Sequence, residues 1–121
     1  MHLSTYTDNI AELQEAIRLI HNNDERKIIW FYGSGSNGKT TFINRYIANT
    51  IRLDHVPDIH KAHRYHSKRV FLIQDFVDEL MPLINCNNYQ FHKPLVIKTN
   101  AFPQQYVGNP DHLIIHFNKT F

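Results

Sequence analysis

Cysteine is almost absent from this sequence, because Cys86 is the single one among 121 residues. One cysteine can form no internal disulfide and cannot build a cysteine-based zinc site. Net charge is also low, with 13 Lys and Arg against 11 Asp and Glu. Bulk electrostatics therefore gives weak support for nucleic-acid binding. We expect a reducing, intracellular setting.

Long apolar runs are missing as well. No stretch approaches the roughly 20 apolar residues that a membrane-spanning helix needs. The first ten residues, MHLSTYTDNI, lack a basic region followed by an apolar run, so we expect neither a secretory signal nor contact with a membrane. Hydrophobic residues still make up 42% of the chain, enough to pack one domain over residues 1–121. We place an N-terminal helix within residues 1–26 and the core in residues 27–121.

Short apolar runs alternate with amphipathic segments along the chain. Apolar residues recur at helical spacing over residues 10–20 and again over residues 42–51. Continuous apolar runs predict buried strands at residues 28–32, 70–73, 95–97 and 113–117, with a weaker candidate at residues 62–65. Residues 76–85 have a helical pattern in which Pro82 is expected to start or break the helix. This alternation predicts an α/β fold with a mainly parallel sheet flanked by helices.

The stretch FYGSGSNGKTTF, residues 31–42, has the pattern of a phosphate-binding (Walker A) loop between a buried strand and a helix. Its glycines allow a tight turn with inward N–H groups, and the following helix N-terminus adds partial positive charge. We expect Lys39 to contact the β- and γ-phosphates of ATP and the Thr40 hydroxyl to bind Mg²⁺, with Thr41 as the alternative. The predicted nucleotide-binding residues are Gly33, Ser34, Gly35, Ser36, Asn37, Gly38, Lys39, Thr40 and Thr41. The competing interpretation is a glycine-rich turn with no ligand.

Polar residues follow two further predicted strands. Asp75 comes just after residues 70–73, and Asn100 follows residues 95–97. In parallel sheets ligands bind at the carboxyl edge, so we expect both side chains near the glycine loop. Asp75 is then the catalytic acid and an Mg²⁺ ligand, and Asn100 orients water or senses the γ-phosphate. The alternatives are a helix-capping Asp and a turn-forming Asn.

Taken together, these residues resemble the ATPase domain of superfamily 3 helicases, found in small DNA viruses and in phage and plasmid primase-helicases. The resemblance covers about residues 27–118. It rests on four stretches: GSGSNGKTTF from Gly33, VFLIQDF from Val70, LVIKTN from Leu95 and HLIIHF from His112. It implies a P-loop NTPase of the AAA+ type that binds ATP and Mg²⁺ and forms rings with ATP at subunit interfaces. It also implies Lys39, Asp75 and Asn100 as catalytic residues.

The sequence departs from that family in three ways. The family usually carries two adjacent acids after the strand that corresponds to residues 70–73, and Gln74 occupies the position of the first of them. Residues 76–93 leave little room for a DNA-gripping hairpin with a basic tip. No arginine occurs after Arg69, although the family carries one before its closing strand. An arginine finger accelerates phosphoryl transfer by orders of magnitude, so we expect slow hydrolysis or an arginine from another copy or a partner ATPase.

A basic and histidine-rich stretch precedes the strand predicted at residues 70–73. His60, His63 and His66 have spacing that could share a metal, although no cysteine or clear carboxylate completes the set. Residues 61–69 also carry four cations around Tyr65, which makes them the best candidate for single-stranded DNA. The simpler interpretation of both features is a solvated polar loop.

The function we expect from the sequence is ATP binding and slow ATP hydrolysis by a minimal superfamily 3 helicase-like domain. The resemblance links this activity to replication of viral or mobile-element DNA, in the cytoplasm or nucleus of a host cell. One alternative is a nucleotide-binding module that regulates a partner helicase. The other is a small P-loop kinase, although the chain lacks the arginine-rich lid near the C-terminus that such kinases carry.

Overall fold

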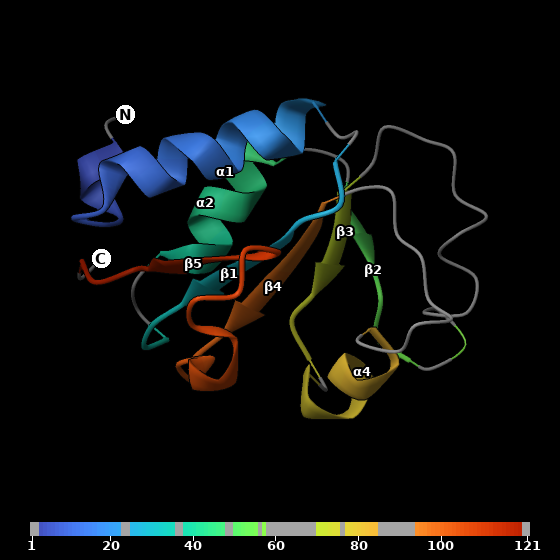
Figure 1. Ribbon diagram of the computed structural model, residues 1–121. Coiled ribbons are helices and arrows are strands. Elements are labelled where there is room, and N and C mark those ends of the chain that lie inside the picture. The colour runs from blue at the N-terminus through green and yellow to red at the C-terminus, as the bar shows by residue number, and fades with distance from the viewer. Residues whose placement is uncertain are drawn as a thin grey trace.

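The computed structural model describes residues 3–22, 25–35, 38–47, 50–55, 57, 70–75, 77–84 and 94–119. Figure 1 shows the elements in chain order. They are η1 (Leu3–Thr5), α1 (Ile10–Asn22), β1 (Ile28–Tyr32), α2 (Lys39–Tyr46), β2 (Thr50–Arg52), β3 (Val70–Ile73), α4 (Val77–Ile84), β4 (Leu95–Thr99), η3 (Gln104–Tyr106) and β5 (His112–His116).

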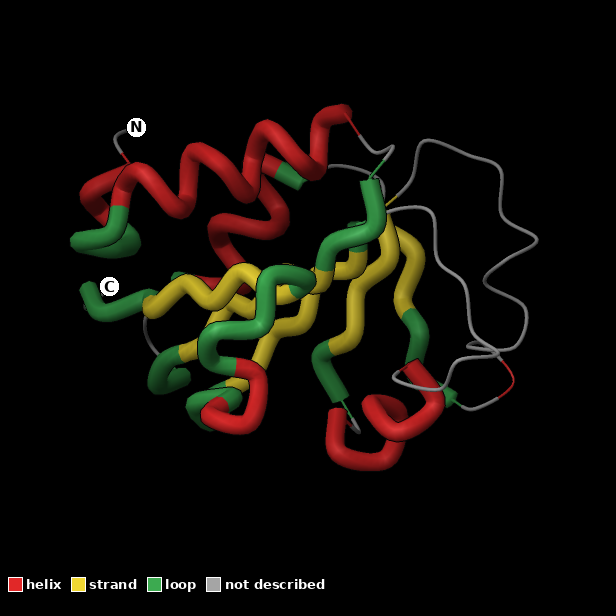
Figure 2. Tube along the Cα trace, in the orientation of Figure 1, coloured by secondary structure: helices red, strands yellow, loops and turns green. Residues whose placement is uncertain are grey.

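Five strands form one sheet in the order β2-β3-β4-β1-β5, and every pair is parallel. The sheet lies between helices on its two sides (Figure 2). The predicted α/β fold with a mainly parallel sheet flanked by helices is therefore confirmed. Because all strands run the same way, their carboxyl ends lie at one edge, where the loops after β1, β3 and β4 begin.

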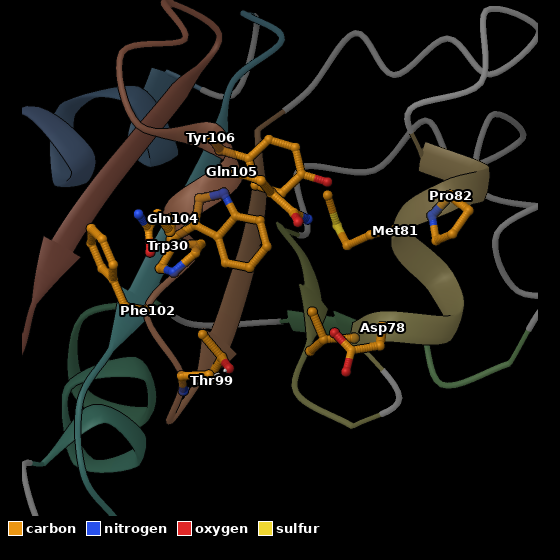
Figure 3. A pocket seen from close by; sticks show the side chains of 12 residues that line it. Trp30, Asp78, Met81, Pro82, Thr99, Phe102, Gln104, Gln105 and Tyr106 are labelled. Atoms are coloured by element: carbon orange, nitrogen blue, oxygen red, sulfur yellow. Dashed lines mark hydrogen bonds between the residues drawn. The ribbon is translucent and has the colours of Figure 1, made fainter.

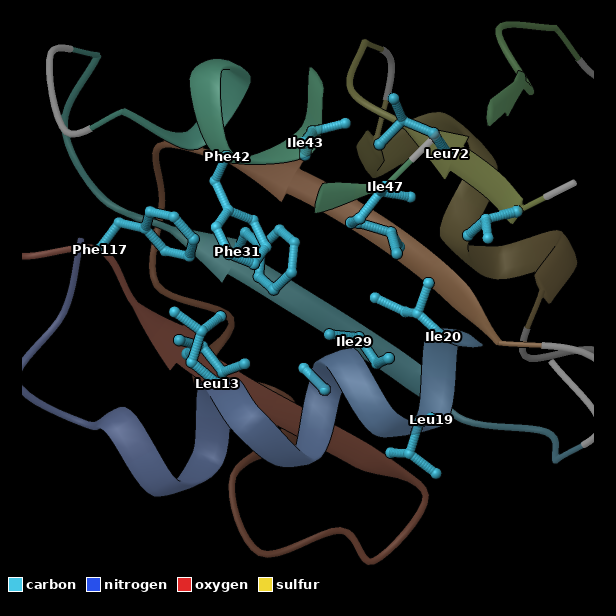
Figure 4. Packing of buried hydrophobic residues seen from close by; sticks show 14 of the residues in the cluster. Leu13, Leu19, Ile20, Ile29, Phe31, Phe42, Ile43, Ile47, Leu72 and Phe117 are labelled. Carbon is cyan, nitrogen blue, oxygen red and sulfur yellow. The ribbon is translucent and has the colours of Figure 1, made fainter. Parts of the chain in front are cut away.

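One face of the sheet packs against α1 and α2 (Figures 1 and 4). Side chains alternate between the faces of a strand, so Ile29 and Phe31 of β1 point to this side. The pattern that predicted a helix over residues 10–20 is confirmed, because α1 buries its apolar stripe here. The stripe consists of Leu13, Ala16, Leu19 and Ile20.

The opposite face packs against α4 and the connection from β4 to β5. Ile28 and Trp30, the alternate residues of β1, belong to this second core with Leu80, Met81 and Ile84 of α4. The chain advances from β1 to β2 in one direction and from β3 to β4 in the other. Right-handed crossovers in opposite directions must lie on opposite faces, which accounts for α2 and α4 being on different sides of the sheet.

Four predicted strands are confirmed with small shifts of their ends, and the helix predicted over residues 42–51 is wrong in its second half. Helix α2 ends at Tyr46, and Ile51 lies in β2. Ile47 packs on the α2 side of the sheet and Ile51 on the α4 side, which one short helix cannot achieve. The strand candidate at residues 62–65 lies outside the described residues. Among the helices that the structure describes, none has the length and apolar character needed to cross a bilayer.

Pro82 neither starts nor breaks the helix around it, contrary to expectation. Helix α4 runs from Val77 to Ile84 with Pro82 inside its last turn. A proline there cannot donate a hydrogen bond to the Asp78 carbonyl one turn earlier. Burial of Leu80, Met81 and Ile84 against the sheet outweighs that loss.

We expect Pro82→Ala to stabilise the protein by about 1 kcal/mol, because alanine restores the missing helical bond while the unfolded chain gains some entropy. Urea unfolding followed by circular dichroism measures the change. Pro82 is exposed, so little packing is lost with its ring. A destabilised variant would show that the ring contributes more through its contacts than it costs the helix.

Candidate phosphate-binding site

The glycine loop leaves the carboxyl end of β1 through two residues with positive φ. Gly33 has φ 152° and Gly38 has φ 82°, a region that favours glycine. The Gly33 N–H donates to the Thr99 carbonyl of β4 at 3.3 Å, which ties the start of the loop to the neighbouring strand. Gly38 directly precedes α2, and its carbonyl accepts from Phe42 N at 2.8 Å. Of the predicted nucleotide-binding residues, Ser36 and Asn37 lie outside the described residues.

Helix α2 is held in place by Phe42, whose side chain is fully buried. Its ring packs edge-on against Phe31 of β1 at 5.4 Å and against Tyr6 at 5.2 Å, measured between ring centroids. It makes a similar contact with Phe117, just after β5, at 5.5 Å. These aromatic contacts fix the first turn of α2 against the sheet, and with it the positions of Lys39, Thr40 and Thr41.

Lys39 is one of the few polar side chains in the interior, with an exposed fraction of 3%. Its ammonium group donates to the carbonyl of Gly33 at 2.6 Å and to that of Ser34 at 2.7 Å. The lysine thus folds back along the loop and points toward its concave side. Burial lowers the pKa of Lys39, and the nearby positive charge of Lys98 lowers this pKa further.

A cavity of about 360 Å³ opens in front of this lysine. Lys98 and Asn100 extend from the end of β4, and their alternation along the chain puts them on the same side of the sheet as α2. The register pairs Thr99 with Tyr32, so Asn100 follows β4 at the level where the glycine loop leaves β1. The described lining residues are Gly35, Gly38, Lys39, Thr40, Thr41, Lys98 and Asn100.

Cations, glycine backbone and hydroxyl groups therefore converge on one small volume. Lys39 and Lys98 are the charged residues among the described lining residues, so the potential there favours an anion. The first turn of α2 adds the partial positive charge of its N–H groups. The arrangement suits a phosphate chain.

Asp75 lies at the same edge of the sheet but does not line this cavity. Strand β4 separates β3 from β1, and two strand spacings put the ends of β3 and β1 roughly 10 Å apart. The Asp75 carboxylate accepts from the Arg52 guanidinium at 2.7 Å, and Arg52 also donates to Asp54 at 3.1 Å. Both side chains are substantially exposed, at 57% for Asp75 and 44% for Arg52. The described structure thus gives Asp75 a cationic partner.

The donors fit an Mg²⁺ ion that is held mainly by phosphate and water. Mg²⁺ keeps several waters and takes one or two oxygen ligands from the protein. Thr40 lines the cavity, so its hydroxyl would be the direct protein ligand of such an ion, whereas Asp75 lies across the end of β4 and would contribute only through water. Among the described residues, no three His, Cys, Asp or Glu side chains gather into a metal site. The histidines at positions 60, 63 and 66 and the basic residues 61–69 lie outside the described residues.

Two functional candidates were missed from the sequence. Lys98 lies on the cavity side because β4 continues to Thr99, two residues beyond the predicted strand. Side chains two residues apart in a strand point to the same face, so the expected position of Asn100 could have indicated Lys98 as well. Arg52 was missed because β2 has only three residues, the first two of which fall within the helix predicted over residues 42–51.

We expect binding of ATP at alkaline pH to be accompanied by proton uptake. The pKa of Lys39 is lowered in the free protein, so part of the population is deprotonated there, and nearby phosphate oxygens would raise the pKa again. Binding enthalpies in two buffers with different ionisation enthalpies measure the uptake. The uptake is expected to grow as the pH rises, because the deprotonated fraction of Lys39 in the free protein grows with it. Proton release at alkaline pH would contradict the placement of phosphate beside Lys39.

Comparison with known proteins leaves the family of the chain open. No protein-family model matches the sequence, and no curated protein matches it.

Proposed function

We propose that this chain binds ATP with Mg²⁺ in the cavity beside Lys39 and hydrolyses it slowly. The fold we infer is that of a P-loop NTPase of the AAA+ type, as a minimal superfamily 3 helicase-like domain. A link to replication of viral or mobile-element DNA rests on the resemblance of the four sequence stretches alone.

The observation that carries the proposal is the position of Lys39. It follows a glycine loop at the carboxyl end of a central parallel strand, it is buried, and its ammonium group lies against the loop carbonyls. Among the described residues no carboxylate is paired with Lys39, and burial of an unpaired lysine is costly and lowers its pKa. A bound phosphate chain would supply negative charge beside Lys39, which accounts for a buried cation at this position.

We assign distinct tasks in hydrolysis to these residues. Lys39 and the loop N–H groups bind the phosphate oxygens and stabilise the negative charge that develops on them. Asn100, next to the loop, holds a water in line with the γ-phosphorus, and Asp75 accepts a hydrogen bond from that water once its carboxylate turns from Arg52. The water oxygen bonds to the γ-phosphorus while its proton passes to the Asp75 carboxylate, the bond from the γ-phosphorus to the β–γ bridging oxygen breaks, and ADP and phosphate leave. Bound Mg²⁺ supplies further neutralisation of phosphate charge.

Steady-state ATP hydrolysis at saturating Mg²⁺ tests this proposal, with ATP binding measured on the same sample. We expect binding and a slow turnover. Adding single-stranded DNA separates a translocating ATPase, whose turnover rises, from one that acts without DNA. Failure to bind ATP would overturn the proposal.

One observation favours a second candidate, a nucleotide-binding module that regulates a partner helicase without turning ATP over. The Arg52 guanidinium occupies the Asp75 carboxylate, which in the first candidate must meet water or Mg²⁺. ATP bound without release of ADP, alone and with single-stranded DNA, would favour this candidate. Turnover by the isolated chain would exclude it.

A further inference from the structure

A second cavity, of about 410 Å³, lies on the other side of the sheet from the phosphate-binding cavity. Figure 3 shows Trp30 and Tyr106 on one side of it and Asp78 and Met81 of α4 on the other, with Thr99 at the end of β4. The two cavities are separated by the end of β4, because successive side chains point to opposite faces. Lys98 and Asn100 line the phosphate-binding cavity, and Thr99 and Ala101 line the second one.

The second cavity has the opposite charge character. Asp78 is the one charged residue among its described lining residues, whereas the phosphate-binding cavity is lined by Lys39 and Lys98. A carboxylate repels phosphate and accepts hydrogen bonds from N–H groups. The second cavity therefore selects against the anionic part of a nucleotide and in favour of a group that carries N–H donors.

Aromatic rings form one wall of this cavity. Tyr106 stacks on Trp30 with ring centroids 5.3 Å apart, and it stacks on His112 at 4.3 Å. The Trp30 indole N–H donates to His112 Nδ1 at 2.9 Å. Burial lowers the pKa of His112, which keeps the imidazole neutral and its Nδ1 able to accept this bond. Trp30 itself is only 3% exposed, and Tyr106 is a partly exposed member of the wall. The wall is therefore pre-ordered, and a planar ring can pack on its Tyr106 side with little loss of entropy.

The polar groups around this wall are of two kinds. The Asp78 carboxylate on α4 only accepts hydrogen bonds, while the amides of Gln104 and Gln105 on η3 both donate and accept. Guanine matches such a set. Its N1–H and N2–H₂ groups are adjacent donors for one carboxylate, and its O6 and N7 accept from amides. Adenine offers an N–H donor beside an acceptor and cannot make the same paired contact.

We propose that the cavity between α4 and η3 binds a guanine base, which stacks near Trp30 and Tyr106 and donates hydrogen bonds to Asp78. The base can come from a free nucleoside or from single-stranded nucleic acid, since both offer the same ring. The site needs no phosphate and does not involve Lys39, so it is separate from the proposed ATPase function.

Trp30 makes the test direct, because it is the only tryptophan of the chain and contacts this cavity. Titration with guanosine, followed by tryptophan fluorescence, is expected to give saturable quenching. Adenosine and cytidine are expected to bind at least about tenfold more weakly, since one charge-assisted hydrogen bond is worth that much. An oligothymidylate with one central guanine, compared with plain oligothymidylate, distinguishes the nucleic-acid source from the nucleoside.

Two variants with matched controls define the site. Asp78→Asn is expected to weaken guanosine at least about tenfold and to leave adenosine unchanged, because only guanine uses both carboxylate oxygens. Glu79→Gln is its control, since Glu79 is also an exposed acid in the first turn of α4 but does not line the cavity. Ala101→Leu is expected to abolish binding by filling the cavity. Ala11→Leu makes the same change at an exposed position of α1, on the opposite face of the sheet.

Each outcome bears on the proposal. Quenching by guanosine that is lost in Asp78→Asn and Ala101→Leu, but kept in both controls and in Lys39→Ala, supports it. Quenching by the guanine-containing oligonucleotide alone also supports it, and assigns the base to nucleic acid. The proposal is overturned by no quenching from either ligand, or by equal quenching from all nucleosides. Loss in Lys39→Ala would also overturn it, because the ring would then be bound in the phosphate-binding cavity.

Discussion

Lys39→Ala is expected to weaken binding of ATP with Mg²⁺ by about 100-fold or more. Lys39 is the buried cation at the start of α2, and its ammonium group lies against the loop that would hold the phosphates. Charge-assisted hydrogen bonds to phosphate are worth about 3 kcal/mol or more in total, which corresponds to that factor. Isothermal titration calorimetry on both proteins measures the change, and turnover should disappear with binding.

Two other lysines provide the controls for this experiment. Lys98 lines the same cavity but is only half-buried, so Lys98→Ala is expected to weaken binding about tenfold. Lys119 does not line the cavity and pairs with Asp8, so Lys119→Ala should bind ATP like the unchanged protein. Circular dichroism confirms that each variant is folded. Unchanged affinity in a folded Lys39→Ala protein would remove the basis of the proposed function.

Asp75→Asn is expected to lower kcat by at least about 100-fold while ATP still binds. An amide cannot accept a proton from water or hold a hydrated Mg²⁺ as a carboxylate does, and losing that charge stabilisation costs several kcal/mol in the transition state. Because Asp75 does not line the cavity, its effect on KM is expected to be small. Steady-state kinetics over a range of ATP and Mg²⁺ concentrations separates kcat from KM.

Asp54→Asn is the matched control, since Asp54 also pairs with Arg52 and lies at the end of β2 rather than β3. It should leave kcat near that of the unchanged protein.

Arg52→Ala is expected to change kcat in the opposite direction to Asp75→Asn. An exposed ion pair contributes at most about 1 kcal/mol to stability, so the variant should fold normally, and releasing Asp75 should raise turnover. Equal losses in Asp54→Asn and Asp75→Asn would assign the effect to the ion-pair network and not to a catalytic acid.

The loop and the lysine could be predicted from the sequence because their signals are local. A run of five apolar residues, three glycines, a lysine and two threonines occur within the fourteen positions from 28 to 41. The structure places that loop between β1 and α2, as the pattern indicates. Helical spacing predicted α1 in the same way, since its apolar stripe repeats within consecutive turns.

The helix predicted over residues 76–85 is confirmed as α4, whereas the predicted end of α2 and the predicted effect of Pro82 failed because distant contacts prevail over local patterns. Ile51 continues the spacing of α2 but lies in β2, and its side chain packs on the face of the sheet opposite to α2. Pro82 stays within a helix because burial of its neighbours outweighs the missing hydrogen bond. Local spacing carries no information on which face of a sheet a segment will cover.

The sequence by itself determined the parallel α/β architecture and the glycine loop with its lysine, because strand periodicity and glycine turns are properties of neighbouring residues. The tertiary structure alone decided which polar residues lie beside the loop and which pair elsewhere. The strand order inserts β4 between β1 and β3, which brings Lys98 and Asn100 beside the loop and leaves Asp75 paired with Arg52. Strand order depends on crossovers that join residues far apart in the chain, and alternation at the end of β4 then divides its polar side chains between two cavities.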